Sequence, residues 1–270
     1  MTQRLWLIGG TQESRQLVQQ LYAVLAASSQ IPTLLITVTT AAARSLYPQA
    51  PPEQIWVGRL TTDEADRFIS DHHITAILDL SHPFAPAISQ LAIAIAETYH
   101  LPYLRYERPA GEEVTECWRD RRDRLGLIQV PQLHDLLTSA YLTSDRTLLT
   151  LGYRQLAEFA PWQSRATLFA RILPSPKALN TALQQGFTPD RLIALRPPIG
   201  LALETALWQH WHITQVITKA SGAPGGQNHK RQLATKLGVR LIEISRPEIA
   251  YPHQTDRLDT ALHFALRYGS

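Results

Sequence analysis

Short apolar runs alternate with amphipathic segments along the whole chain. In the first half, strand-like runs cover residues 4–8, 33–38, 55–57, 76–80 and 103–106, with helical patterns at 13–26, 62–71 and 86–100. In the second half, strands are predicted at residues 147–151, 167–173, 191–195, 215–219 and 240–245, with helices at 132–140, 176–185, 200–209, 227–237 and 255–267. Strands that alternate with helices are typical of βαβ units around a parallel sheet. The pattern therefore predicts an α/β protein, and the first helix should bury Leu17, Leu21, Val24 and Leu25.

One stretch of the chain lacks this periodicity. Residues 108–131 are rich in charge and contain Pro109, Gly111, Gly126 and Pro131, which are typical of a connection. We therefore predict two Rossmann-like lobes, residues 1–140 and 141–270, with parallel sheets that face a shared cleft. Ligands of such sheets bind outside the carboxyl ends of the strands, so the residues at those ends are the candidates for a site.

Composition narrows the class of protein. The hydrophobic share of 44% is that of a globular chain, and no apolar run reaches the length of a membrane span. The N-terminus does not have the pattern of a signal peptide, so a cytoplasmic protein is expected. The single Cys117 excludes an internal disulfide and a multi-cysteine metal site, and we expect no metal.

The net charge of +3 is compatible with an anionic partner. Most basic residues are dispersed along the sequence, and a nucleic-acid surface would be denser and interleaved with aromatic residues. Nucleic-acid binding is therefore not expected. The exception to the dispersion is a cluster formed by Arg119, Arg121, Arg122 and Arg124.

A glycine turn follows the first predicted strand. Gly9 and Gly10 allow the backbone to turn tightly and approach a phosphate, and a helix N-terminus stabilises such an anion. The complete G-x-G-x-x-G fingerprint is absent, since no third glycine follows. Two interpretations stay open, namely a cofactor contact by Gly9, Gly10 and Thr11, or an ordinary turn with Thr11 as the helix N-cap.

The second strand ends in hydroxyls followed by a basic residue. An NAD-specific site normally has an acidic residue here for the ribose hydroxyl, but this chain has Thr39, Thr40 and Arg44. These side chains are suited to a 2′-phosphate and favour NADPH, with NADH as the alternative. Arg44 as a solvated loop residue is the other interpretation.

The fourth strand ends in Ser81, His82, Pro83 and Phe84. Proline stops the strand and keeps His82 extended. Ser81 and His82 are then expected to face the cleft, and Phe84 is available to stack on a flat ring.

Two arginines follow the fifth strand. Arg105 and Arg108 are suited to carboxylates. The alternative for Arg105 is a surface ion pair with Glu107.

The second lobe has two comparable strand ends. Gly152 closes one strand and Arg154 follows it as a candidate for anion binding. Lys219 ends another strand and precedes a glycine-rich loop and a helix, a combination that predicts a site for an anion. This loop supplies the further candidates Ser221, Gly222, Gly225, Gly226 and Lys230, although it is not a Walker A motif.

Taken together, these segments resemble the precorrin-6A reductase family of cobalamin biosynthesis, in its cobalt-free or cobalt-containing branch. The matching segments occur in family order, and they are residues 7–15, 81–85, 103–109, 152–154, 170–174, 219–230 and 246–247. The sequence departs from the family where Leu80-Ser81 replaces Ala-Thr. It also departs where Arg196-Pro197-Pro198-Ile199-Gly200 replaces a Gly-Pro-Phe element, so any ligand contact by that loop is in doubt.

The resemblance implies an oxidoreductase that reduces one double bond of precorrin-6A or cobalt-precorrin-6A with NAD(P)H. With this resemblance, the cofactor phosphates are expected either at Gly10 and Thr11 or at the Gly225-Gly226 turn. The residues expected to hold the cofactor are Gly9, Gly10, Thr11, Thr39, Thr40, Arg44, Ser81, Phe84, Gly152, Arg154, Ser221, Gly222, Gly225, Gly226 and Lys230. Arg105, Arg108 and Arg171 are expected to hold the carboxylates of an anionic tetrapyrrole. Lys219 and His82 are the candidates for proton delivery, and solvent is the alternative. The chain is expected to be a monomer or a small homo-oligomer.

Two other functions remain open from the residues alone. A nucleotide-sugar transferase would share the glycine-rich strand ends, and so would a non-catalytic protein that binds nucleotides or tetrapyrroles. Oxidation of NAD(P)H in the presence of substrate separates a reductase from both.

Overall fold

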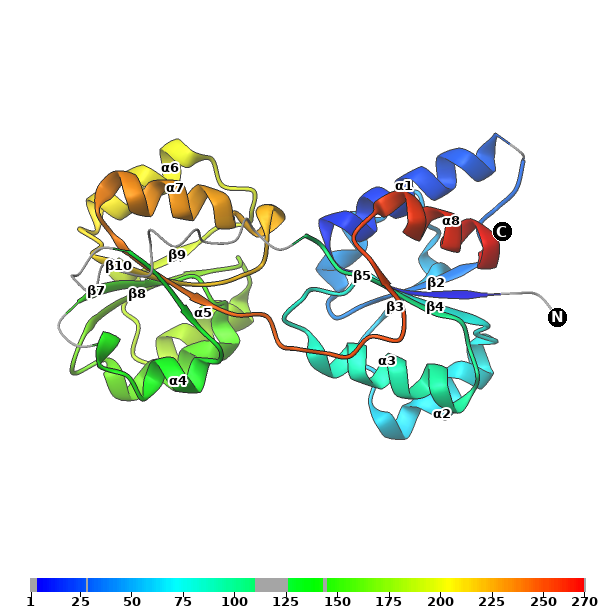
Figure 1. Ribbon diagram of the computed structural model, residues 1–270, viewed down its shortest axis with the longest axis horizontal. Coiled ribbons are helices and arrows are strands. Elements are labelled where there is room, and N and C mark those ends of the chain that lie inside the picture. The colour runs from blue at the N-terminus through cyan, green and yellow to red at the C-terminus, as the bar shows by residue number, and fades with distance from the viewer. Residues whose placement is uncertain (1–3, 28, 110–125, 143–144, 270) are drawn as a thin grey trace. The chain divides into compact units, whose positions relative to one another are not determined.

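The computed structural model describes residues 4–27, 29–109, 126–142 and 145–269. The chain forms two compact units, Met1–Pro109 together with Glu248–Ser270, and Ala110–Pro247. Each unit is built around one parallel six-stranded sheet (Figure 1). The predicted α/β class with two parallel-sheet lobes is therefore confirmed. No helix in the described ranges is both long and apolar enough to cross a membrane.

The first unit has the strand order β12-β5-β4-β1-β2-β3. Its strands are β1 (Leu5–Ile8), β2 (Leu34–Val38), β3 (Ile55–Val57), β4 (Ala76–Asp79), β5 (Tyr103–Tyr106) and β12 (Gln254–Thr255). Its helices are α1 (Gln12–Ala26), α2 (Thr62–His72), α3 (Pro86–Thr98) and α8 (Leu258–Tyr268), with short 3-10 helices η1 (Ala41–Leu46) and η2 (Pro52–Gln54). The central strands are buried on both faces, as expected for a parallel sheet covered by helices.

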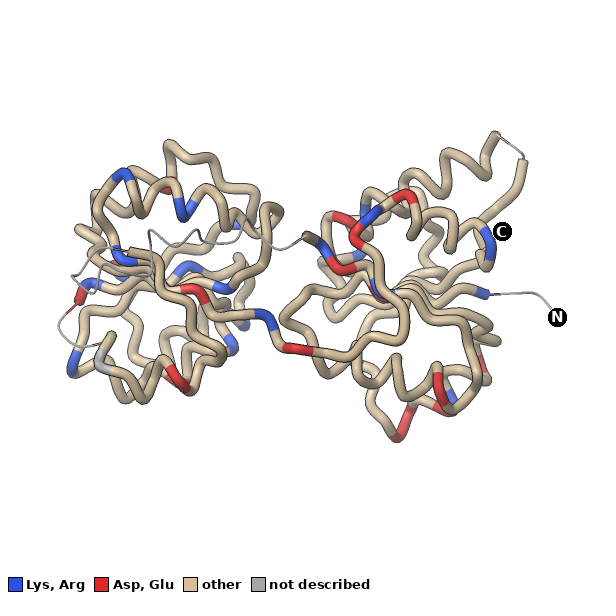
Figure 2. Tube along the Cα trace, in the orientation of Figure 1, with Lys and Arg blue, Asp and Glu red and all other residues tan. Residues whose placement is uncertain are grey.

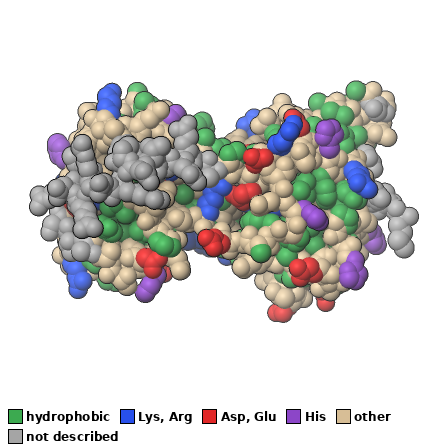
Figure 3. Space-filling view, viewed as in Figure 1, with side chains coloured by type: hydrophobic (Ala, Val, Ile, Leu, Met, Phe, Trp, Pro, Cys, Tyr) green, Lys and Arg blue, Asp and Glu red, His purple; other side chains and the backbone are tan. Residues whose placement is uncertain are grey.

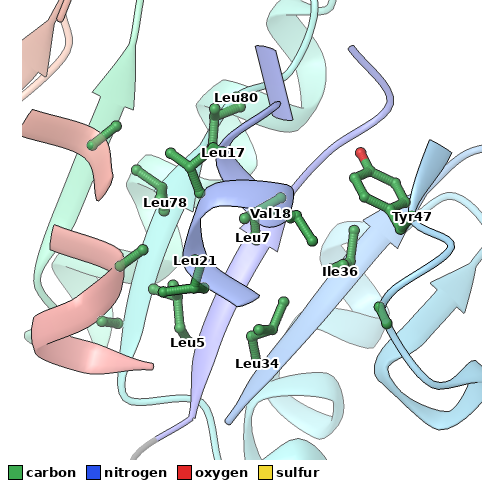
Figure 4. Close-up of a cluster of buried hydrophobic side chains, with 14 of the residues drawn as sticks. Leu5, Leu7, Leu17, Val18, Leu21, Leu34, Ile36, Tyr47, Leu78 and Leu80 are labelled. Atoms are coloured by element: carbon green, nitrogen blue, oxygen red, sulfur yellow. The ribbon is translucent and has the colours of Figure 1, made fainter. Parts of the chain in front are cut away.

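One face of this sheet is covered by α1 and α8, and the other by α2 and α3 (Figure 1). Leu17, Val18 and Leu21 of α1 pack over Leu7 and Ile36 of the sheet (Figure 4). The predicted apolar face of α1 is largely correct. Val24, however, is 44% exposed, and Val18 is buried in its place. Val18 lies three residues before Leu21 and seven before Leu25, and this spacing places it on the same helical face.

The second unit has the strand order β6-β11-β10-β7-β8-β9. Its strands are β6 (Leu127–Val130), β7 (Arg146–Leu149), β8 (Thr167–Ile172), β9 (Leu192–Ala194), β10 (Gln215–Lys219) and β11 (Arg240–Ile244). Its helices are α4 (Leu133–Leu137), α5 (Pro176–Gln184), α6 (Leu201–His210) and α7 (Gln227–Leu237). Its 3-10 helices are η4 (Ala140–Leu142), η5 (Tyr153–Trp162), η6 (Pro189–Arg191) and η7 (Ala223–Gly225). Helices α6 and α7 cover one face and bury Trp208 and Leu233 against the sheet (Figure 1).

The first sheet has the Rossmann order 3-2-1-4-5-6. In the second sheet, β7 to β11 have the order 3-2-1-4-5, and the sixth position is taken by β6, which precedes them in the chain. In the first unit the chain passes from β1 outwards to β3 and then returns to place β4 on the other side of β1. In the second unit β7 and β10 have the same relation. At such a point the connections that follow two adjacent strands run to opposite faces of the sheet. They leave a crevice at the carboxyl ends of these strands, and this is where α/β ligands bind. The two switch points, β1/β4 and β7/β10, therefore define where a site can lie in each unit.

The two units divide the chain differently from the expected change near residue 140. Strand β6 lies in the range expected for the first lobe, yet it pairs with β11 in the second sheet. Strand β12 and α8 lie in the range expected for the second lobe, yet β12 pairs with β5 and α8 packs in the first core. Both strands are short edge strands with little burial. Strand β6 also lies in the stretch that was expected to be a connection, so neither strand was predicted.

Candidate functional site

At the first switch point, the glycine turn after β1 is held from inside the unit. Gly10 adopts φ +97 and has open space where a side chain would stand, so glycine is needed for the backbone and nothing blocks the approach of a ligand. Its N–H donates to the Tyr47 hydroxyl at 2.7 Å, and the same hydroxyl lies 2.7 Å from Ser14 Oγ. Gly9 packs directly against Tyr47. Tyr47 is buried, and this burial raises the pKa of its hydroxyl.

Thr11 is the N-cap of α1, as one of the two interpretations predicted. Its Oγ1 accepts from Ser14 N at 3.1 Å and donates to the Leu80 carbonyl at 3.0 Å. The second of these bonds ties the β1 turn to the residue that follows β4. Within the described part of the chain, the N–H groups of Gln12 and Glu13 have no hydrogen-bond partner. They are the donors that the first turn of α1 offers to an anion.

The end of β2 is exposed. Thr39, Thr40 and Arg44 are all exposed, and Arg44 lies in η1. They are accessible, as a role in binding requires, and their role stays a prediction.

The end of β4 is a buried polar network, which the sequence did not reveal. Asp79 is the last residue of β4 and is fully buried. Its Oδ1 accepts from Ser81 N at 2.9 Å and from Arg105 Nη1 at 2.9 Å. Its Oδ2 accepts from Ser89 Oγ at 2.6 Å and from Tyr103 OH at 3.1 Å. Burial raises the pKa of Tyr103 strongly, and the negative charge of Asp79 adds to this effect.

The predicted ion pair of Arg105 with Glu107 exists, but it is mostly covered, since the Glu107 side chain is only 23% exposed. Arg105 is fully buried, and its Nη2 lies 2.7 Å from Glu107 Oε2. Its Nη1 donates to Asp79 and to Ser81 Oγ, the latter at 2.9 Å, and its guanidinium lies 5.2 Å from the centre of the Tyr251 ring. The guanidinium of Arg105 donates its hydrogen bonds to Asp79, Ser81 and Glu107 within the protein. The structure therefore gives no support to direct binding of substrate by Arg105.

The other two arginines proposed for substrate are also paired with carboxylates. Arg108 is buried with its Nε 2.9 Å from Glu13 Oε1, and its Nη2 donates to Oε2 at 3.0 Å. Arg171 Nη1 lies 2.7 Å from Glu204 Oε1, and Glu204 is itself buried. In both pairs the carboxylate comes from a helix distant in sequence, which no local pattern could have indicated.

His82 is exposed at the edge of the sheet. Its Nδ1 accepts from the backbone N–H of Phe84 at 3.1 Å, and the two rings lie 6.0 Å apart. Because Nδ1 is an acceptor, the neutral imidazole carries its proton on Nε2. Phe84 is half-buried beside it.

The second switch point brings basic residues to the ends of adjacent strands. Gly152 follows β7 with φ +84 and open space where a side chain would stand, and Arg154 is exposed and stacks on Tyr153. Lys219 ends β10, where burial and the positive charge of Arg154 lower its pKa to about 8. Arg246 follows β11 and donates from Nε to the Ala220 carbonyl at 2.8 Å. The sequence did not single out Arg246 as a site residue, although the family segment at residues 246–247 contained it.

The glycine-rich loop after Lys219 is internally bonded. Gly222 N donates to Gln227 Oε1 at 2.8 Å, Gly225 N to the Gly222 carbonyl at 3.0 Å, and Gly226 N to the Ala223 carbonyl at 2.9 Å. In this conformation these N–H groups do not form the anion nest that the sequence predicted. The glycines instead allow close packing, since a side chain on Gly225 would overlap Ser221.

Lys230 has a different position from the one expected. Its side chain is buried, and Nζ donates to the carbonyls of Gly225 at 2.8 Å and Gly226 at 3.4 Å. Burial, and then the nearby Arg171, lower the pKa of this lysine to about 8. Lys230 therefore holds the loop from beneath, together with Gln227, whose Nε2 donates to the buried Glu243 at 2.7 Å.

Some predicted features have no structural test. Cys117 and the cluster Arg119, Arg121, Arg122 and Arg124 lie outside the described residues. Among the residues that are described, no group of His, Cys, Asp and Glu could hold a metal ion. Histidine side chains are visible at several places on the first unit (Figure 3), and Lys and Arg are dispersed over both units (Figure 2).

Two Rossmann-ordered sheets, each with a glycine turn or basic residues at its switch point, define the class of two-lobed α/β nucleotide-binding enzymes. The family described as "Precorrin-6x reductase CbiJ/CobK" matches residues 4–265. The chain belongs to this family of reductases, as the resemblance predicted.

Individual relatives agree with the family. The chain is 43% identical over 269 residues to a cobalt-precorrin-6A reductase of Synechocystis, covering 97% of this chain and 96% of that protein. It is 29% identical over 260 residues to the cobalt-precorrin-6A reductase of Priestia megaterium, with 95% and 96% covered. It is also 29% identical over 259 residues to the precorrin-6A reductase of Rhodococcus erythropolis, with 95% and 93% covered.

A solved structure shares the fold. The structure titled "CobK precorrin-6A reductase" superposes with a TM-score of 0.75 at 21% identity, covering 100% of this chain and 98% of that one.

Proposed function

We propose that the chain reduces one double bond of cobalt-precorrin-6A with a reduced nicotinamide nucleotide, in cobalamin biosynthesis. Membership of the reductase family carries this proposal. The cobalt-containing substrate is favoured over precorrin-6A because the 43% identical Synechocystis relative bears that name, whereas the precorrin-6A reductase of Rhodococcus is 29% identical.

The residues of the first unit fit a nicotinamide nucleotide. The open space over Gly10 and the free N–H groups of Gln12 and Glu13 suit a phosphate group. Thr39, Thr40 and Arg44 are exposed at the end of β2, and no acidic residue occurs between residues 33 and 52. This combination favours a 2′-phosphate, and therefore NADPH over NADH. When bound, the nucleotide supplies the hydride.

The residues of the second unit fit the carboxylates of the tetrapyrrole. Arg154, Lys219 and Arg246 follow β7, β10 and β11, which are neighbours in the sheet. Within the described residues, Arg154 forms no ion pair with a carboxylate of the chain. Charge-assisted bonds from such residues recognise carboxylates. We therefore assign Gly152 and Arg154, which were expected at the cofactor, to the substrate together with Lys219. We assign Ser221, Gly222, Gly225, Gly226 and Lys230, also expected at the cofactor, to the loop that supports them, because this loop is internally bonded.

A proton must reach the macrocycle when it is reduced. Lys219, with a pKa of about 8, holds a proton that it can release near neutral pH. His82 in its neutral form carries a proton on Nε2 at the edge of the first sheet. These two side chains are the candidates for proton delivery, and Ser81 and Phe84 frame His82.

The test offers purified protein precorrin-6A and cobalt-precorrin-6A side by side, and follows the absorbance of NADPH and of NADH in parallel. We expect turnover of the cobalt compound with NADPH at a kcat/KM at least about tenfold above the other combinations, which corresponds to about 1.4 kcal/mol.

If neither tetrapyrrole supports oxidation of NADPH or NADH, the proposed function is contradicted. Hydrolysis or transfer of a nucleotide-sugar, offered to the protein in a parallel assay, points to a transferase. Binding of NADPH and tetrapyrrole without oxidation points to a non-catalytic carrier.

A further inference from the structure

The buried carboxylate of Asp79 lies directly behind the first switch point. It is the last residue of β4, whose neighbour in the sheet is β1. Four donors converge on its two oxygens, from the Ser81 backbone, Ser89, Tyr103 and Arg105, at distances of 2.6 to 3.1 Å. A carboxylate with two bonds at each oxygen has nearly all of its acceptor positions filled.

Such a network is not explained by stability alone. Moving a charge out of water costs several kcal/mol, and a buried ion pair recovers that cost only with complete hydrogen bonding. Apolar residues at the end of β4 would stabilise the fold as well or better. The Asp79–Arg105 pair, with side chains exposed by 0% and 1%, is therefore better explained by the geometry it imposes on its neighbours.

The network fixes Ser81 at three points. Its N–H donates to Asp79 at 2.9 Å, its Oγ accepts from Arg105 Nη1 at 2.9 Å, and the same oxygen lies 3.2 Å from Ser89 Oγ. The next residue is His82, which is exposed. The buried carboxylate of Asp79 thus fixes the backbone of Ser81 and, through it, the position of the exposed His82.

We infer that Asp79 is a positioning residue of the enzyme, which acts through Ser89, Tyr103 and Arg105 to hold Ser81 and His82 at the carboxyl edge of the first sheet. The inference rests on the proposed function, which places Ser81 and His82 at the site of reduction. Reaction geometry tolerates only small displacements, since a shift of about 1 Å in a positioned group can cost about a hundredfold in rate.

The test removes single donors while it leaves the charges in place. Tyr103→Phe deletes the hydroxyl that donates to Asp79, and Ser89→Ala deletes the second one. The matched controls are Tyr99→Phe and Ser70→Ala, which delete exposed hydroxyls that bond Asp66 instead. For all four variants, kcat and KM are measured with NADPH and tetrapyrrole. Hydrogen exchange of residues 80–84 and the unfolding temperature are measured on the protein alone.

We expect Tyr103→Phe and Ser89→Ala to lower kcat by about tenfold or more, as the loss of a hydrogen bond to a charged group predicts. KM for NADPH should change less than kcat, and the Ser81 amide should exchange faster. Both control variants should match the wild type in all three measurements. Wild-type kcat and Ser81 exchange in both test variants would overturn the inference, and so would a fall in kcat that only follows the folded fraction.

Failure of the proposed function would be visible separately. If the wild type fails to oxidise NADPH with either tetrapyrrole, the hydrogen exchange of the same variants decides. Faster exchange at Ser81 with an unchanged unfolding temperature supports the positioning role, and unchanged exchange at Ser81 overturns it.

Discussion

Lys219 is the residue whose environment most directly suggests chemistry. Burial is the larger cause of its lowered pKa and Arg154 is the second, and together they bring the pKa to about 8. The protonated form is present below that pH and is lost above it. Such a group is an effective proton donor near neutral pH, because most of it is protonated there and its pKa is close enough to the pH for the proton to be released.

If Lys219 delivers the proton, kcat should fall as the pH rises through about 8. Lys219→Arg keeps a positive charge but does not release a proton in this range, so we expect its kcat to fall by about a hundredfold or more while KM for the tetrapyrrole stays close to wild type. Profiles of kcat and KM from pH 6 to 10 check this, with the exposed Lys236→Arg as the control. Retained kcat in Lys219→Arg would leave Lys219 as a cation that only binds carboxylates.

At the residue scale, the sequence indicated which residues lie at the strand ends, but it did not indicate the role of each residue. Ser81 and His82 were found because proline and polar residues follow a buried run. The pairing of Arg108 and Arg171 was missed because each carboxylate partner comes from another element, as Glu13 does for Arg108, 95 residues away. For Arg105 the pair with Glu107 was foreseen, but the pair with Asp79 of the neighbouring strand was not. Tyr47 was missed for the same reason, since an isolated tyrosine in a loop shows no sign that its hydroxyl holds Gly10.

At the scale of elements, the glycine-rich loop after β10 depends on close packing. A side chain on Gly225 would overlap Ser221 Oγ and lie 2.8 Å from its Cβ. Because Ser221 adjoins the strand that ends in Lys219, a shift of Ser221 would displace the strand end as well.

Gly225→Ala should therefore lower kcat/KM by about tenfold or more, with the loop more sensitive to limited proteolysis. Ser221→Gly in the same chain removes the overlap and should restore resistance to proteolysis. Gly200→Ala is the matched control, because Gly200 has φ −67 and open space around it. Equal activity of Gly225→Ala and Gly200→Ala would show that the packing is not required.

The elements themselves were largely predictable. Strands β3, β5 and β10 and helix α7 have the predicted bounds, since continuous apolar runs and clear end signals mark them. The helix predicted at residues 132–140 is shorter, because α4 ends at Leu137 and a 3-10 turn follows. The 3-10 helix η5 was not predicted, since Pro161 and mixed polarity interrupt its pattern.

At the scale of the molecule, the first unit is made of two separate parts of the chain. Ala261 and Ala265 of α8 are fully buried in the core formed by β1, β2 and β4, and Gly269 N–H is bonded to α8 while its carbonyl accepts from Thr33. The edge strand β12 also gives β5 its outer partner. The sequence could not show this, because a short polar edge strand and one amphipathic helix are compatible with either sheet.

Residues 1–109 alone should therefore fail to fold. We expect weak, non-cooperative thermal unfolding by circular dichroism, because the face of the sheet covered by α1 and α8 loses α8 and the sheet loses its edge strand β12. The same residues joined through a flexible linker to residues 248–269 should unfold cooperatively. Cooperative unfolding of residues 1–109 alone would show that α8 and β12 are dispensable.

This two-part first unit also sets the order of events on the ribosome. Strand β5 leaves the exit tunnel early, but β12 and α8 are made only after the whole second unit, a delay on the order of ten seconds at bacterial rates of synthesis. During that time the nascent first unit has an open sheet edge and an uncovered apolar face, both of which attract chaperones. The second unit meets no such delay, so it should mature first although its sequence comes later. A chain truncated after Pro247 would therefore contain a complete second unit and an incomplete first unit, and the incomplete unit would mark the chain for proteolysis.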